Sequence, residues 1–149
     1  MNTIPAYPRT LGLAGLLPQL ACLLALIAGP AEWRFAALAL AWGYAALIFS
    51  FLGGMWWGIA ASRLHSAHRV PEWLWLAAVA PSLIAFATYL PWVFAAQWPQ
   101  PSLVVLGLGL IASLAVDRAI AHLAPPWWLR LRMVLSIGLG LATLGTAFA

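Results

Sequence analysis

The side chains of this sequence that could most readily do chemistry are two adjacent charges, Asp117 and Arg118. They lie near the end of a long apolar segment, where an acid indicates a polar site between helices. Such a site could be part of a proton path or could hold the cation of a partner. The alternative interpretation is structural: Arg118 extends to the lipid headgroups while Asp117 bonds Arg130, Arg132 or the start of another helix. Because both charges lie close to the membrane surface, the sequence favours the structural interpretation.

Two further polar residues could complete a binding site around these charges. Gln19 follows Pro18 inside the first apolar segment, where its amide could hydrogen-bond across helices or contact a substrate. Ser50 lies within the second apolar segment. The set that we expect for a polar site therefore consists of Gln19, Ser50, Asp117 and Arg118.

Metal, redox and catalytic chemistry are not favoured by the remaining residues. His65, His68 and His122 fall in predicted loops or at a helix end with no acid beside them, so we expect solvated histidines rather than ligands of a metal or haem. The single cysteine, Cys22, is expected to pack as a small apolar residue. An enzyme would need converging catalytic groups, which the apolar segments do not supply. The sequence therefore predicts no enzyme, no metal and no cofactor.

The composition explains why reactive side chains are scarce. Hydrophobic residues make up 65% of the 149 residues and charged residues only 7%, whereas a soluble domain carries roughly a quarter charged residues. The chain is therefore predicted to be an integral membrane protein. Its net charge of +4 comes from seven arginines and three acids. This small excess gives no indication of a nucleic-acid surface.

Five apolar segments are long enough to cross a bilayer, which takes about 20 residues. Thr10 is the expected cap of the first segment, and proline pairs or charges bound the others. We predict an all-α bundle in a single membrane domain over residues 1–149, with spans at residues 11–28, 35–61, 72–90, 102–122 and 127–148.

The arginines predict the orientation of this bundle. Arg34 falls on one side of the membrane, and the other six of the seven arginines fall on the side of the N-terminus. These six are Arg9, Arg63, Arg69, Arg118, Arg130 and Arg132. The positive-inside rule therefore predicts a cytoplasmic N-terminus and a C-terminus outside.

Nine of the ten tryptophans lie near a predicted membrane boundary. They are Trp33, Trp92 and Trp98 at the outer boundary, and Trp56, Trp57, Trp73, Trp75, Trp127 and Trp128 at the inner one. This distribution is typical of an aromatic belt. Trp42 lies deeper in the second span, where it either faces lipid or fills a gap between helices.

A run of small residues in the second span predicts a helix-packing surface. On a helix, residues four positions apart stack on one face, and small residues there form a ridge of little volume. Another helix backbone can approach such a ridge closely, either from this chain or from a partner. The small-residue ridge consists of Ala46, Ser50, Gly54 and Gly58, and the same spacing continues to Ser62.

The same stretch resembles the signature of the transmembrane protein 69 family, also called domain of unknown function 3429. The signature positions are Ser50, Phe51, Leu52, Gly53, Gly54, Trp57 and Gly58. The likeness continues at residues 11–18 and 80–82, at Asp117, at residues 128–130 and at Arg132. Family members often carry His or Arg where this chain has Trp56. The resemblance implies a multi-pass protein of bacterial inner membranes and mitochondria and supplies no reaction, so we expect a bacterial inner-membrane location.

Together these features favour a small non-enzymatic accessory subunit or assembly factor of a larger membrane complex, respiratory or otherwise energy-transducing. Its expected partners are the lipid bilayer and other integral membrane proteins, with no nucleic acid. The competing hypothesis is a binder or transporter of a small molecule, lipid or quinone with a site near Asp117. The sequence identifies neither the complex nor the ligand.

Overall fold

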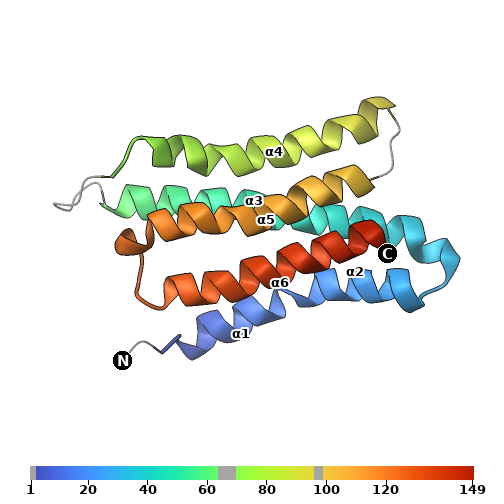
Figure 1. Cartoon of the computed structure of the whole chain (residues 1–149), viewed down its shortest axis with the longest axis horizontal. Coiled ribbons are helices and arrows are strands. Elements are labelled where there is room, and N and C mark those ends of the chain that lie inside the picture. The colour runs from blue at the N-terminus through green and yellow to red at the C-terminus, as the bar shows by residue number, and fades with distance from the viewer. Residues whose placement is uncertain (1–2, 64–69, 96–98) are drawn as a thin grey trace.

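The computed structural model describes residues 3–63, 70–95 and 99–149, and within these ranges the chain is all helical (Figure 1). The α-helices are α1 Ala6–Ala14, α2 Leu17–Ala28, α3 Arg34–Arg63, α4 Trp73–Ala95, α5 Gln100–Ala119 and α6 Trp128–Phe148; two short 3₁₀ helices are η1 Ala31–Trp33 and η2 Ala121–Leu123. Five segments of this part of the chain are long and apolar enough to cross a membrane. The predicted all-α architecture with five spans is thereby confirmed.

The first span differs from its prediction because it consists of two helices. It begins at Ala6 rather than at residue 11, and the hydroxyl of Thr10 donates to the Ala6 carbonyl inside the helix instead of capping it. The helix breaks after Ala14 because Pro18, four residues on, has no N–H to donate and its ring collides with the carbonyl of residue 14. The Gly15 carbonyl, at the break, accepts a hydrogen bond from the Tyr44 hydroxyl of α3.

The other boundaries lie within a few residues of their predictions, with two differences. Helix α4 continues through Pro91 to Ala95, beyond the predicted end at residue 90. Helix α5 ends at Ala119, and the residues up to 122 enter the 3₁₀ helix η2 instead of continuing the α-helix. These differences change the length of the spans and not their number.

Helix α3 is the centre of the bundle, since it contacts α2, α4, α5 and α6. Figure 1 shows α4 along one edge and α1 with α2 along the opposite edge, with α3, α5 and α6 between them. Helix α1 packs against α6, and its contacts with α3 are few or none. The buried core lies mainly between α3 and its neighbours and includes Ala45, Phe49, Leu52, Leu74, Leu106 and Leu110.

Two pairs of helices approach each other closely at glycines. A Cβ added to Gly53 of α3 would collide with the carbonyl oxygen of Ala78 on α4. A Cβ added to Gly140 of α6 would lie 2.5 Å from Cγ1 of Ile111 and 2.9 Å from the carbonyl oxygen of Gly107, both on α5. Because such distances exclude any side chain, these glycines allow α3–α4 and α5–α6 backbone contact.

Trp42 fills a gap between helices rather than facing lipid. Its ring stacks on Tyr89 and meets Trp92 edge-on, with ring centroids 5.4 Å and 5.3 Å away. Its indole N–H donates to the hydroxyl of Thr88 at 3.1 Å. All three partners belong to α4, so Trp42 joins the N-terminal half of α3 to the C-terminal half of α4.

Candidate functional site

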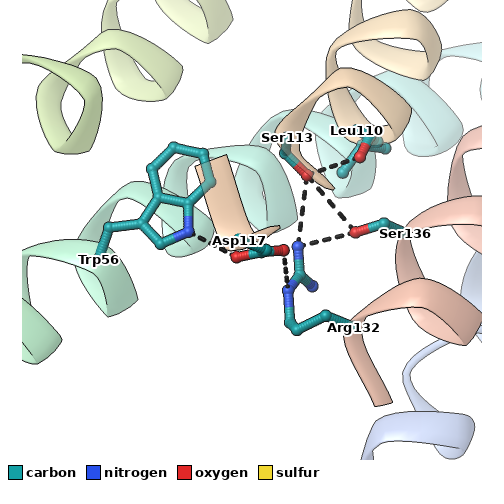
Figure 2. Close-up of polar contacts among 6 residues, drawn as sticks. All are labelled: Trp56, Leu110, Ser113, Asp117, Arg132 and Ser136. Atoms are coloured by element: carbon teal, nitrogen blue, oxygen red, sulfur yellow. Dashed lines mark hydrogen bonds and ion pairs between the residues drawn. The ribbon is translucent and has the colours of Figure 1, made fainter. Parts of the chain in front are cut away.

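Five polar side chains from three helices meet inside the bundle, and we call this group the Asp117 network (Figure 2). Trp56 comes from α3, Ser113 and Asp117 from α5, and Arg132 and Ser136 from α6. Their exposed fractions are low: 0% for Asp117, 2% for Trp56 and 5% for Arg132. The network is therefore buried inside the bundle.

Each oxygen of the Asp117 carboxylate accepts one hydrogen bond. Arg132 Nε donates to Oδ2 at 2.8 Å, which is also an ion pair, and Trp56 Nε1 donates to Oδ1 at 2.7 Å. Arg132 Nη2 donates to the hydroxyl of Ser136 at 2.7 Å and lies 3.4 Å from that of Ser113. A buried ion pair requires such additional hydrogen bonds, because desolvation of the two charges can exceed their mutual attraction.

The local sequence explains how these side chains come together. Ser113 and Asp117 are four residues apart on α5, and Arg132 and Ser136 are four residues apart on α6, so each pair shares one helix face. The close approach of α5 and α6 at Gly107 brings the two faces into contact. Trp56 reaches the carboxylate from α3.

Asp117 pairs with Arg132, one of the partners that the structural interpretation named. Arg118 is exposed and does not belong to the network. Successive residues on an α-helix point about 100° apart, since one turn takes 3.6 residues. The carboxylate of Asp117 therefore faces the bundle, while the guanidinium of Arg118 faces outward.

Sequence analysis did not assign Ser113, Ser136 or Trp56 to a polar site, and it placed Trp56 in the aromatic belt. The aromatic-belt interpretation is wrong for this residue, because its ring is buried and its N–H binds a carboxylate. Trp57 is 48% exposed, as a belt residue would be. No local sequence signal separates Trp56 from its exposed neighbour Trp57.

The predicted polar set is not brought together by the fold. The hydroxyl of Ser50 pairs with that of Ser82 on α4 at 2.8 Å. Gln19 is 0% exposed, and both polar atoms of its amide lack a hydrogen-bond partner in the described part of the chain. Of the four predicted residues, the structure places Asp117 alone in the network, because the other three lie on different helix faces.

The half of the small-residue ridge formed by Gly54 and Gly58 packs against no other helix of the described chain. Gly54 and Gly58 are exposed, and a Cβ added to either would meet no described atom within 4 Å. Ala46 and Ser50 line an open groove of about 390 Å³ between α3 and α4. Within the signature, the internal contact is made by Gly53, one residue from the ridge.

An apolar cavity of about 440 Å³ adjoins the Asp117 network. The first span, α3, α5 and α6 line it, and the lining residues with polar side-chain atoms include Arg132, Ser136 and Trp128. Most of the lining is aliphatic, including Leu11, Leu16, Leu52, Met55, Leu135 and Leu139. Sequence analysis did not predict this cavity.

The predicted absence of a metal site is not decided by the structure. Within residues 3–63, 70–95 and 99–149, no three His, Cys, Asp or Glu side chains lie close enough to hold a metal ion. His122 is exposed. His65, His68, Arg69 and Trp98 lie outside the described residues.

Comparison with known proteins agrees with the resemblance seen in the signature. Residues 4–148 match the family described as "Protein of unknown function (DUF3429)". The chain is 34% identical over 142 residues to "Transmembrane protein 69" of Xenopus tropicalis, in an alignment covering 92% of this chain and 52% of that protein. It thus spans about half the length of this relative. No solved structure matches the chain. This multi-pass membrane protein therefore belongs to the DUF3429 family.

Proposed function

We propose that this protein is a non-enzymatic accessory subunit or assembly factor that packs against another integral membrane protein through the small-residue ridge of α3. The observation that carries the proposal is the open space over Gly54 and Gly58. Association of transmembrane helices depends on close packing, and small residues four apart are a common means of achieving it. The part of the ridge at Gly54 and Gly58, which no described residue covers, is therefore suited to a helix of another protein.

The dimensions of the ridge support a helix as its partner. From Ala46 to Gly58 the ridge runs about 18 Å at 1.5 Å per residue, more than half of the roughly 30 Å hydrocarbon core. The groove between α3 and α4 continues the surface at Ala46 and Ser50. Phe51 and Trp57 of α3 are 60% and 48% exposed and would add apolar contact area beside the ridge.

A non-enzymatic role is supported by the way the buried acid is used. Both oxygens of Asp117 already accept hydrogen bonds, from Trp56 and Arg132. A general acid or base must reach the proton that it transfers. The contacts of Asp117 instead tie α3, α5 and α6 together.

Substituting the ridge should separate assembly from folding. We expect Gly54→Leu or Gly58→Leu to reduce co-migration with a larger complex in mild detergent about tenfold or more, because a leucine would hold the partner helix away. The thermal midpoint of the isolated protein should stay unchanged, since no described atom lies within 4 Å of a Cβ at either glycine. Leu141→Phe, at an exposed position on α6, is the matched control. A wild-type protein that is a free monomer, with no partner crosslinked in native membranes, would contradict the proposal.

The proposed setting is a bacterial inner membrane with the N-terminus in the cytoplasm. Arg9, Arg63 and Arg118 belong to one end of the bundle, whereas Arg34 donates to the carbonyl of Ala149 at the other end. This asymmetry supports the positive-inside orientation. We expect alkaline phosphatase fused after Ala149 to be active, and green fluorescent protein at the same place to be dark, in a bacterial host. The reverse pattern would show that the orientation is opposite.

A second candidate function is binding of a small molecule, lipid or quinone near Asp117. The specific observation in its favour is the cavity of about 440 Å³ that touches Arg132 and Ser136. Its size lies within the range of small-molecule sites, about 300–1,000 Å³, and its mostly apolar wall with few polar groups is typical of them.

A further inference from the structure

We propose that this cavity binds a membrane amphiphile with one apolar chain and a head that presents hydrogen-bond acceptor oxygens to Arg132 and Trp128. The inference rests on the second candidate function and adds the chemical class of the ligand. It does not depend on the small-residue ridge, which lies elsewhere on α3.

The walls of the cavity suit an apolar chain that enters from the bilayer. Leu11 of α1 and Phe51 of α3 both line the cavity and are 71% and 60% exposed, so the mouth lies between these two helices. Helix α1 packs against α6 and has few or no contacts with α3. The break between α1 and α2, at Gly15 and Leu16, directs α1 toward α6. These two residues also line the cavity.

Two residues at the polar end of the cavity, Trp128 and Arg132, each have an N–H group without a hydrogen-bond partner in the described part of the chain. The indole Nε1 of Trp128 is buried and has no hydrogen-bond partner in the described part of the chain. Arg132 uses Nε for Asp117 and Nη2 for Ser136. Its third nitrogen, Nη1, forms no hydrogen bond with the residues drawn in Figure 2 and points away from the carboxylate. Both residues line the same cavity.

These two groups define the chemistry of the head. Guanidinium and indole nitrogens donate hydrogen bonds and accept none, so the complementary head carries carbonyl, ester or phosphate oxygens. An ammonium head would meet donors only. Because Asp117 already balances the charge of Arg132, a neutral head is accommodated as well as a charged one.

The depth of the site matches an amphiphile of a single leaflet. Trp128 is the first residue of α6, and Leu139 lies deeper along the same cavity wall. Eleven residues at 1.5 Å each separate them by about 16 Å, close to half of the roughly 30 Å hydrocarbon core. The head therefore lies near the membrane surface and the chain reaches the bilayer centre.

Trp128→Phe tests the head, because it removes the N–H and keeps most of the ring. We would titrate the purified protein in mild detergent with two single-chain probes, 1-oleoyl lysophosphatidylglycerol and decylubiquinone, and measure Kd by native mass spectrometry. The variant should bind one of these probes about tenfold more weakly, as expected for one lost hydrogen bond. Its thermal midpoint without probe should not fall, since no described residue accepts a hydrogen bond from this N–H. Trp127→Phe, which does not line the cavity, is the matched control.

Met55→Trp tests the cavity itself by filling it from α3. Saturable binding of the same probe should be lost, whereas Leu141→Trp on the exposed face of α6 should bind normally. The probe that responds to both variants identifies the head as phospholipid or quinone. Loss of binding in Met55→Trp with unchanged binding in Trp128→Phe would leave the second candidate function standing and overturn the assignment of the head. Absence of saturable binding of either probe to the wild type would overturn both.

Discussion

Replacing Arg132 with leucine should destabilise the bundle by about 3–5 kcal/mol, because the carboxylate of Asp117 would remain buried without its counter-charge. Asp117 is 0% exposed, so water cannot replace the guanidinium. The N–H of Trp56 would be its remaining partner within the network. The free energy of unfolding, measured in detergent micelles by denaturant titration, gives the size of the effect.

Two further variants show whether the effect belongs to the ion pair. Arg118→Leu removes the neighbouring exposed arginine and should change the free energy of unfolding by less than about 0.5 kcal/mol. The double variant Asp117→Leu with Arg132→Leu should be more stable than either single variant, since it leaves no unpaired buried charge. Additive losses in the double variant would contradict a pairwise role for Asp117 and Arg132.

The adjacent glycines Gly53 and Gly54 should respond in opposite ways to the same substitution. Gly53→Ala should destabilise the protein by about 1–3 kcal/mol or more, because its Cβ would collide with the Ala78 carbonyl and force α3 and α4 apart. Gly54→Ala should be neutral or stabilising by up to about 1 kcal/mol, since alanine favours the helix and its Cβ meets no described atom within 4 Å. Equal effects of the two substitutions on the unfolding free energy would show that α3 is rotated about its axis relative to this structure.

The number of spans could be predicted from the sequence because apolar length and charge scarcity report directly on the bilayer. The break in the first span was harder to place. Pro18 was visible, but α1 ends four residues earlier, at Ala14, whose carbonyl would collide with the proline ring if the helix continued. Sequence patterns mark the cause of such a break more clearly than its position.

The inward faces of the helices could not be predicted to the same degree. In a soluble helix, polar residues mark the outer face, but in a bilayer both lipid-facing and buried residues are apolar. The four-residue spacing of small residues therefore drew attention to Gly54, whereas the contact with α4 is made by Gly53. For the same reason, the sequence could not show that Trp56 is buried and that Trp57 is exposed.

The Asp117 network could be predicted in part. An acid in an apolar segment stands out, and Arg132 was among its expected partners. Trp56 could not be identified because it is 61 residues away in the chain and an indole near a membrane boundary has a simpler explanation. The cavity depends on the packing of α1 against α6, which no local sequence pattern predicts.

The ion pair between Asp117 and Arg132 also bears on how the chain enters the membrane during synthesis. A charged side chain alone in a span costs up to about 3 kcal/mol at the bilayer centre and less toward the ends. Asp117 and Arg132 belong to consecutive spans, α5 and α6, joined by a short connection that contains η2. If the two helices partition into lipid together as a hairpin, each charge arrives with its counter-charge. The last two spans should therefore insert as one unit, and a chain truncated before α6 should retain α5 poorly in the bilayer.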